Sequence, residues 1–245
     1  MATRLLLQLD GSIAIDGMPK LDVTQREIEV ANIQGLEYWP GLFSWDLNDA
    51  NNGFLDRVTD QAAPIWAAGD IRGKFTNFAD GYVAYELNSV NSALIKQPFP
   101  ATGSFTVAAV VGPELSMGSI TDGAGYWYLS SSGGKLRYNL GGVGTVYEDY
   151  TGPALNNTKM TYVVFIFDRA NGELRLRVNG ALVNSTKATS LTTANVKSEL
   201  AFGRTNVNGT VQSRLGHYRV AIGFSRALTG ANLASLEAML AESVY

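Results

Sequence analysis

The stretch NGELRLRVNGALV, residues 171–183, decides the fold class because it contains one strand held between two tight turns. Leu174, Leu176 and Val178 alternate with charged side chains, which is the period of a strand with one buried and one solvated face. An Asn-Gly pair stands at each end of the strand, and this dipeptide readily takes the positive φ angles of a type I′ hairpin turn. The stretch therefore predicts a central strand that is joined to both neighbours by hairpins.

The segment before it, residues 160–168, is continuously apolar and rich in β-branched and aromatic residues, which predicts a strand covered on both faces. Further short strands are expected at 105–111, 126–131, 135–140, 145–150, 199–203 and 217–224. The segments between them are rich in Gly, Asn and Ser, the residues of turns. Many short strands with close turns predict an all-β sandwich or barrel and argue against a fold of alternating strands and helices. For residues 39–100 we expect loops and short edge strands.

The two ends of the chain differ from this pattern. Thr229 is placed to cap a short C-terminal helix, in which Leu233, Leu236 and either Met239 or Leu240 form an apolar stripe. The N-terminal residues 1–38 alternate apolar and polar side chains and turn at Asp-Gly pairs, and residues 26–33 are expected to form another strand.

This N-terminal segment predicts a division of the chain into two parts. Residues 1–38 would be a β extension or assembly arm that docks on a neighbouring subunit, and residues 39–245 would be the sandwich. The alternative is that residues 1–38 add strands to the same sandwich.

Composition excludes several classes of function. The net charge is −3 and Lys and Arg are scattered, so nucleic acid is not an expected partner. The absence of cysteine excludes disulfides, thiol nucleophiles and cysteine-bound metals. No apolar run approaches the roughly 20 residues that span a bilayer, and residues 1–12 lack the apolar core of a secretory signal.

Two longer motifs resemble a known family. The pairing of YVVFIFDRANGELRLRVNGALV (162–183) with GHYRVAIGFSRALTGANLASLEAML (216–240) is similar to the laminin-G-like, concanavalin A-like lectin/glucanase group. The resemblance extends over about residues 40–242 and is specific between 159 and 240. It implies a jelly-roll-like sandwich of two antiparallel sheets, and it leaves function open, because this fold serves lectins, adhesion modules, glycoside hydrolases and structural domains.

The composition of the chain and its N-terminal segment resemble a second group of proteins. A cysteine-free β chain that is rich in Gly and Asn and begins with a strand-like arm resembles virion proteins of tailed bacteriophages. In such particles similar sandwiches occur in tail fibres, receptor-binding proteins and capsid decorations. The resemblance implies a location in the virion, an extracellular particle assembled in the host cytoplasm, with other virion proteins as partners and a homo-oligomeric state.

Glycoside hydrolysis is the main enzymatic alternative, and the sequence gives it little support. Enzymes of the resembled fold carry Glu-x-Asp-x-Glu on one strand, which places two carboxyl groups on one face. That pattern is absent here, and the side chains of Glu148 and Asp149, as strand neighbours, point to opposite faces. Glu27 and Glu29 share a face but lie in the N-terminal extension.

Nucleophilic catalysis is also not expected. The single histidine, His217, is predicted to be a solvated surface residue on the same strand face as Arg219. Residues 223–227, GFSRA, lack the second glycine of a nucleophile elbow. We therefore predict no catalytic residues.

Two groups of residues are candidates for ligand binding. Tyr126, Trp127 and Tyr128, with Tyr138 on the next strand, are the predicted carbohydrate-binding residues, since an aromatic ring on an open sheet can stack on a pyranose ring. The alternative for whichever ring points inward is core packing.

The second group offers oxygen ligands in DLNDANNGFLD, residues 46–56, and Asp46, Asn48 and Asp49 are weak calcium candidates. An ordinary turn rich in Asp and Asn explains the same residues. No other cofactor is expected.

Together these observations predict a non-catalytic virion protein with a structural or adhesion role. Its lectin-like sandwich would bind cell-surface polysaccharide of the host, and its arm would bind other virion proteins. A purely structural assembly subunit without a ligand is the alternative, followed by a glycoside hydrolase of the same fold.

Overall fold

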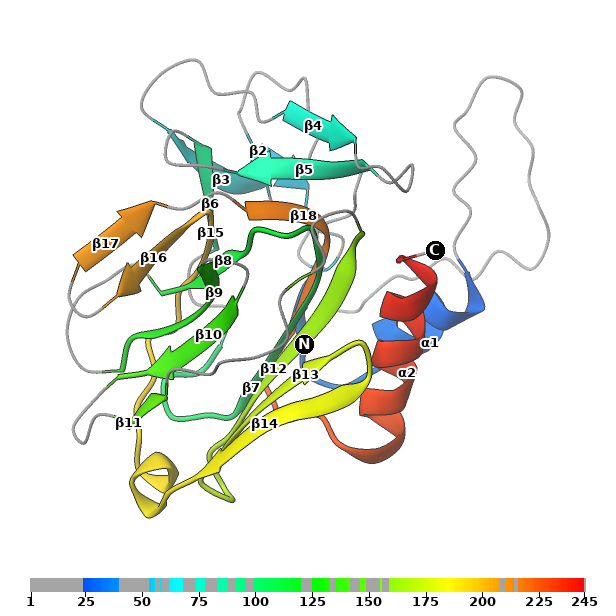
Figure 1. The fold of residues 1–245 in the computed structure, drawn as a ribbon. Helices are drawn as coiled ribbons and strands as arrows, with labels where there is room; N and C mark the ends of the chain where they lie inside the picture. The colour runs from blue at the N-terminus through cyan, green and yellow to red at the C-terminus, as the bar shows by residue number, and fades with distance from the viewer. Residues whose placement is uncertain are drawn as a thin grey trace.

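The computed structural model is a sandwich of two antiparallel sheets, with two helices packed against the outside of one sheet (Figure 1). The structure describes residues 24–39, 53–55, 58, 62–67, 74–77, 83–87, 91–95, 99–119, 125–132, 135–141, 146–148, 155, 159–207, 210–213 and 216–244.

Each sheet has eight strands, so the predicted fold class is confirmed. The first sheet has the order β14 (Ala181–Lys187), β13 (Glu173–Val178), β12 (Thr161–Asp168), β7 (Phe105–Val111), β18 (Gly216–Phe224), β5 (Val83–Leu87) and β4 (Lys74–Asn77), and β1 (Leu36–Tyr38) also pairs with β18. The second sheet has the order β11 (Val146–Glu148), β10 (Lys135–Leu140), β9 (Trp127–Ser132), β8 (Ser116–Gly118), β15 (Leu200–Phe202), β6 (Asn91–Ile95), β3 (Ala62–Ala67) and β2 (Gly53–Leu55). A separate hairpin is formed by β16 (Arg204–Val207) and β17 (Thr210–Ser213).

The prediction for residues 39–100 is partly wrong. β2 and β4 are edge strands, as expected, but β3, β5 and β6 each lie between two other strands of a sheet. Long-range pairing to β15 and β18 places them there, and this pairing leaves no signal in the local sequence.

The turns on either side of β13 differ in geometry. Asn179 and Gly180 both have positive φ, at 47° and 80°, as a type I′ turn requires. In the preceding loop, which joins β12 to β13, only Gly172 has positive φ. There the Asp168 carboxylate accepts hydrogen bonds from the Asn171 backbone N–H and side-chain amide, so a side chain stabilises a four-residue loop.

Strand β12 lies in the interior of the first sheet, and all eight of its residues are buried. Val163, Phe165 and Phe167 face the second sheet, whereas Tyr162, Val164 and Ile166 face the helices. As predicted from its continuous apolar run, this strand is covered on both faces.

The space between the sheets is filled by aromatic rings. Trp127 of the second sheet stacks on Phe165 of the first, with ring centroids 6.0 Å apart and planes 14° from parallel. Phe105 contacts the same tryptophan at 4.8 Å and also packs on Phe99 at 4.9 Å. Such ring pairs add to the large apolar area that each side chain buries.

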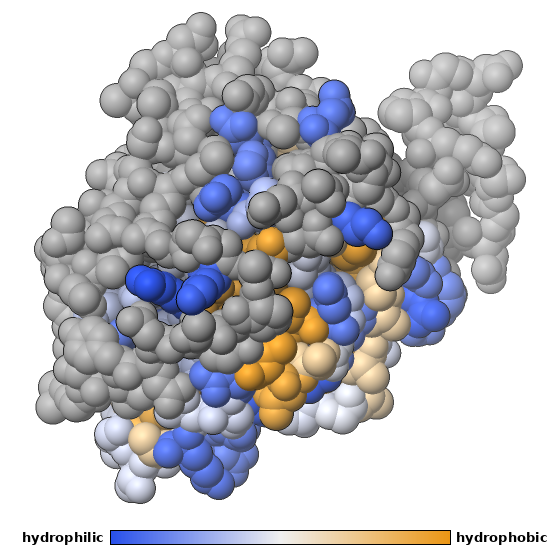
Figure 2. Space-filling model, in the orientation of Figure 1, coloured by the Kyte–Doolittle hydropathy of each residue, from blue (hydrophilic) through white to orange (hydrophobic). Residues whose placement is uncertain are grey.

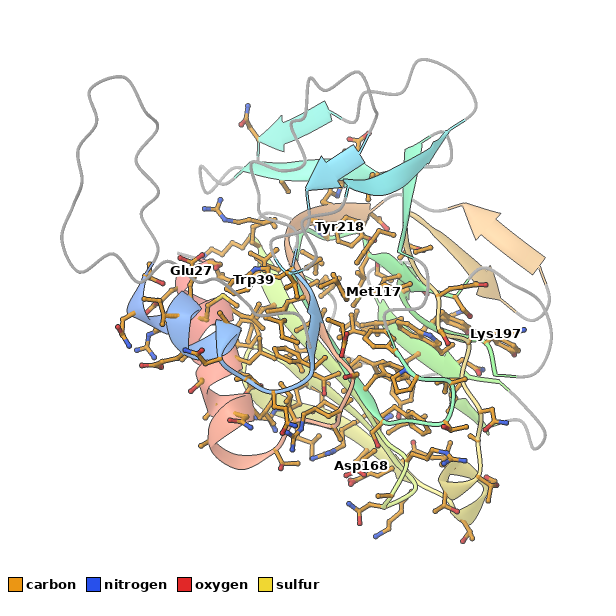
Figure 3. The ribbon with its side chains drawn as sticks, turned by 180° about the vertical axis from the view of Figure 1, so that it is seen from behind. Glu27, Trp39, Met117, Asp168, Lys197 and Tyr218 are labelled. Atoms are coloured by element: carbon orange, nitrogen blue, oxygen red, sulfur yellow. The ribbon has the colours of Figure 1, made fainter. Side chains whose placement is uncertain are left out.

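One tyrosine ties the two sheets together by hydrogen bonds. The Tyr218 hydroxyl, on β18, accepts a hydrogen bond from the Ser116 backbone N–H of β8 at 3.0 Å and donates to the Ser116 carbonyl. Its ring is fully buried near Met117, and both residues lie in the interior of the sandwich in Figure 3. Burial raises the pKa of the Tyr218 hydroxyl, against the effect of its backbone hydrogen bonds, so the group stays neutral.

Residues 26–31 lie in a helix, so the strand predicted over residues 26–33 is wrong. Helix α1 (Gln25–Ala31) begins with a capping box, in which Thr24 accepts from the Glu27 N–H and the Glu27 carboxylate accepts from the Thr24 N–H. This T-x-x-E signal satisfies two of the backbone donors at the helix start and overrides the apparent alternation of the segment.

The N-terminal segment is also less separate from the sandwich than expected. Val30 of α1 and Leu36 of β1 are buried against the outer face of the first sheet, and Tyr38 enters the core between the sheets. Residues 25–38 thus pack with the sandwich, and the rest of the predicted arm, residues 1–23, lies outside the described residues.

The C-terminal helix α2 (Gly230–Glu242) follows the prediction. Thr229 is at the N-cap position but its side chain makes no capping hydrogen bond, and Leu236, Met239 and Leu240 are buried. An ion pair fastens the helix to β13, since Arg177 donates two hydrogen bonds to the Glu237 carboxylate, at 2.7 and 3.1 Å. These bonds raise the pKa of the Arg177 guanidinium, against the effect of its partial burial.

Substitution Tyr218→Phe should destabilise the protein by about 1–3 kcal/mol, because it removes two buried hydrogen bonds, one from the Ser116 N–H and one to the Ser116 carbonyl, while the ring is kept. The free energy of unfolding can be measured by urea denaturation. A change below about 0.5 kcal/mol, the range of a neutral surface substitution, would show that the hydroxyl does not link the sheets.

The ion pair of Arg177 with Glu237 should show coupling in a double-mutant cycle. With Arg177→Met, Glu237→Gln and the double variant, we expect a coupling free energy of about 1 kcal/mol, because the pair is bidentate and mostly shielded from water. Thermal unfolding of the four proteins provides the measurement. The exposed pair of Arg26 with Glu242 serves as the control and should show weaker coupling.

Candidate functional site

The four predicted carbohydrate-binding residues lie on two different faces of the second sheet. Trp127 pairs with Leu140 across β9 and β10, and Tyr138 pairs with Leu129, and all four point into the core between the sheets. Tyr126 and Tyr128 lie on the opposite, outer face, because side chains alternate along β9. The structure therefore brings two of the candidates together and separates them from the other two.

Trp127 and Tyr138 are components of the core. Trp127 is fully buried, its ring stacks on Phe165, and its Nε1–H donates to the Lys197 carbonyl at 3.2 Å. The Tyr138 hydroxyl is 2.9 Å from the Thr186 hydroxyl of β14, which joins the two sheets near one edge. Neither ring has a free face for a sugar in this structure.

The outer face of the second sheet carries a group of polar and aromatic side chains. We call it the polar outer face and define it as Tyr126, Tyr128, Ser130, Arg137 and Asn139. The register of the strands places Asn139 opposite Tyr128, and Arg137 opposite Ser130. Tyr128, Ser130 and Asn139 are at most 8% exposed. An aromatic ring beside an amide and a hydroxyl is a common combination for recognising sugars.

Tyr126 takes its place on this face because Gly141 has no side chain. A Cβ atom added at Gly141 would lie 2.1 Å from Cε1 of Tyr126, so the ring packs directly on the backbone of the chain after β10. The Gly141 N–H also donates to the Tyr126 carbonyl at 2.7 Å. The start of β9 is thereby held against the end of β10.

Asn139 is the most unusual residue of the polar outer face. It is 2% exposed, and its buried Oδ1 atom accepts no hydrogen bond. Most buried side-chain oxygens in proteins have a partner, because an unpaired one costs about 1–3 kcal/mol. The segment KLRYNL could have revealed this position, since Leu136 and Tyr138 point inward and so place Arg137 and Asn139 together on the other face.

The two outer faces of the sandwich differ in chemistry. The outer face of the first sheet is apolar and is covered by α1 and α2. On the side of the second sheet, the β16–β17 hairpin lies beside β8 and β9 (Figure 1). In the space-filling view of Figure 2, hydrophobic residues form a strip over β13 and β14, and hydrophilic residues border it. Polar residues capable of binding a sugar are therefore grouped on the second sheet.

The prediction for His217 is wrong. The residue is 7% exposed, and its Nε2 atom lies 3.7 Å from a Glu86 carboxylate oxygen. Strand β5 pairs beside β18 and places Glu86 directly opposite His217. A register shift between Tyr218 and Val220 also breaks the alternation that the prediction assumed for Arg219.

The other predicted site residues are tested only in part. Asp46, Asn48 and Asp49 lie outside the described residues, as does Asp149. In the described part of the chain, no group of three or more His, Cys, Asp or Glu residues is arranged to hold a metal ion. No helix among these residues is long and apolar enough to cross a membrane.

Substitution Trp127→Ala should destabilise the protein by about 3–5 kcal/mol, because it removes the ring that fills the centre of the core. The measurement is the free energy of unfolding from urea denaturation. The half-exposed Leu182 provides a control, since Leu182→Ala should change stability by less than about 1 kcal/mol. A Trp127→Ala protein with unchanged stability would contradict the assignment of this ring to the core.

The structure has the same fold as several solved binding domains. It aligns with the binding domain of botulinum neurotoxin serotype D/C at a TM-score of 0.56 and 14% identity, covering 84% of this chain and 52% of that one. It aligns with a botulinum neurotoxin type C structure, whose title links cell entry to two ganglioside molecules, at 0.56 and 16%, covering 84% and 51%. The serotype G binding domain gives 0.57 and 15%, covering 83% and 51%. The chain thus spans about half the length of these structures.

The sequence itself identifies the family. No curated protein sequence matches the chain. A family profile does match, over residues 80–234, which include the central strands of the first sheet and most of the second. The chain belongs to the laminin G family described as the concanavalin A-like lectin/glucanases superfamily.

Proposed function

We propose that this protein is a non-catalytic adhesion protein of a bacteriophage virion, which binds glycans of the host surface through the polar outer face of its second sheet. The tail fibre, a receptor-binding protein and a capsid decoration are the positions in the particle that suit this role. The N-terminal arm predicted over residues 1–38 would contact other virion proteins, and the assembled form would be a homo-oligomer.

The observation that carries the glycan-binding role is the composition of the polar outer face. Two tyrosines, an arginine, an asparagine and a serine lie together on a regular sheet, and the amide oxygen of Asn139 has no partner within the protein. Sugars present apolar ring faces and hydroxyl groups side by side, and this surface offers a counterpart to both.

The comparisons support a binding role in general terms. The similar neurotoxin structures are named as binding domains, and one title mentions gangliosides. Because this chain covers only about half of each, the likeness does not identify the half that binds the ganglioside. The superfamily also includes glucanases, but the sequence lacks the Glu-x-Asp-x-Glu pattern that hydrolysis on this fold uses.

The experiment is a glycan array with the purified protein, followed by a cell-binding assay, comparing the wild type with Tyr128→Ala. We expect glycan binding by the wild type and a loss of at least about tenfold in Tyr128→Ala, because one aromatic contact and one polar contact disappear together.

The matched control is Tyr162→Ala, a tyrosine of equal exposure, 8%, on the outer face of the other sheet. Binding should be unchanged in the folded control. If the wild type bound no glycan and no host cell, the adhesion role would be abandoned, and release of reducing sugar from a polysaccharide would show a hydrolase instead.

A further inference from the structure

Among the described strands, β14 is the longest that lies at the edge of a sheet (Figure 1). It has seven residues and pairs only with β13, whereas the strands at the other ends of the two sheets, β4, β11 and β2, have three or four residues. A short edge leaves little backbone for another chain to pair with, but a long one is a template for strand addition. The edge of this sandwich that can accept a further strand is therefore β14.

The side chains of β14 do not shield it from a partner. Four of the seven are exposed: Ala181, Leu182, Ser185 and Lys187. Leu182, at 52%, is the only large hydrophobic side chain of the described residues that is exposed. The strand contains no proline and only one charged residue, the lysine at its end. Edge strands that avoid pairing commonly carry proline or inward-pointing charges, and β14 has neither.

The backbone of β14 is open to pairing in its second half. A register shift interrupts the first half, so the regular stretch is residues 184–187. The Ala188 N–H donates to the Gly172 carbonyl at 2.9 Å, and successive residues of a strand direct their backbone groups alternately to the partner strand and away from it. Ser185 and Lys187 therefore direct their N–H and carbonyl groups away from β13.

We infer that β14 pairs antiparallel with β14 of a second copy of this chain across a twofold axis, which joins the two first sheets into one. Ser185 lies opposite Lys187 of the second copy, and Thr186 lies opposite the second Thr186 on the axis. The residues that direct their backbone groups outward thus bond to each other, once on each side of the axis. The inference gives a surface to the homo-oligomer named in the proposed function and rests on that part of it alone.

The charges beside this edge favour a second copy as the partner. The Ser185 hydroxyl donates to the Glu173 carboxylate at 2.7 Å, so Glu173 lies next to the position that Lys187 of the second copy reaches. An Arg175 nitrogen lies 3.4 Å from an Asp168 oxygen and another lies 3.7 Å from a Glu173 oxygen, and two carboxylates with one guanidinium leave a net negative charge. Each lysine therefore meets a negative group, and the two lysines do not face each other.

The first experiment measures dimer formation by sedimentation velocity of the full chain at several concentrations. Ser185→Pro removes an outward N–H twice in each dimer and should weaken association at least about tenfold. Ser185→Ala keeps this N–H and should associate as the wild type does. Lys187→Glu brings carboxylates together across the axis and should also weaken association at least about tenfold. Lys135→Glu, the same change at an exposed position of the second sheet, should have no effect.

The second experiment uses the absence of cysteine from the chain. In a pair of residues that do not bond to each other, such as Thr186 with its copy, the Cα atoms of antiparallel strands lie about 4.5 Å apart, within the range of a disulfide. Thr186→Cys should therefore form a covalent dimer on oxidation with copper phenanthroline, detected by non-reducing gel electrophoresis. Thr193→Cys, at an exposed threonine outside the strand, is the control and should stay monomeric.

The contrary results separate the proposals. A wild type that is monomeric at about 0.1 mM would overturn both the β14 pairing and the homo-oligomer. An oligomer that Ser185→Pro and Lys187→Glu leave unchanged would overturn the pairing alone, and so would equal cross-linking of Thr186→Cys and Thr193→Cys. If Ser185→Pro does not fold, Lys187→Glu and the two cysteine variants decide the question. Glycan binding does not enter these measurements and is decided by the glycan array.

Discussion

The stacking of Trp127 on Phe165 and Phe105 is the contact on which the rest of the structure depends. Two sheets with a gap between them are stable only if inward side chains fill that gap at close-packed density, and the largest ring in the core does this at the centre. Side chains alternate along β9, so Tyr126 and Tyr128 point outward when Trp127 points inward. The direction of Trp127 thereby determines which residues form the polar outer face.

The two sheets use their outer faces in different ways. The central strands of the first sheet, β12, β7 and β18, carry apolar residues on both sides, and the helices α1 and α2 pack on their outer face. Their attachment combines burial of Val30 and Leu236 with a bidentate ion pair between Arg177 and Glu237. The second sheet has small and polar residues on its outer side, where a purely structural strand would carry apolar ones. The two outer faces of the sandwich thus differ in chemistry.

Within the core, hydrogen bonds set the relation of one sheet to the other. The hydroxyl of Tyr218 joins β18 to the backbone of β8, and that of Tyr138 contacts Thr186 across the opposite part of the sandwich. Both tyrosines thus place a polar group inside the sandwich where it finds a hydrogen-bond partner. The Asn139 Oδ1 atom differs, because it is one of the buried polar atoms of the described residues that make no hydrogen bond.

The sequence alone determined the antiparallel sandwich, the limits of its central strands and the C-terminal helix. These features follow from local signals: alternation in β13, the Asn179-Gly180 turn and the apolar stripe of α2. Signals of a few residues can compete, and at α1 the capping box of Thr24 and Glu27 prevailed over an alternation of similar length.

Only the tertiary structure decided which face of β9 is the core, that His217 is buried beside Glu86, and that Asn139 has an unpaired oxygen. A strand pattern shows that two faces exist but not what covers each of them. Burial, hydrogen-bond partners and the direction of the aromatic rings depend on strands that are far apart in the chain, and long-range pairing brings them together.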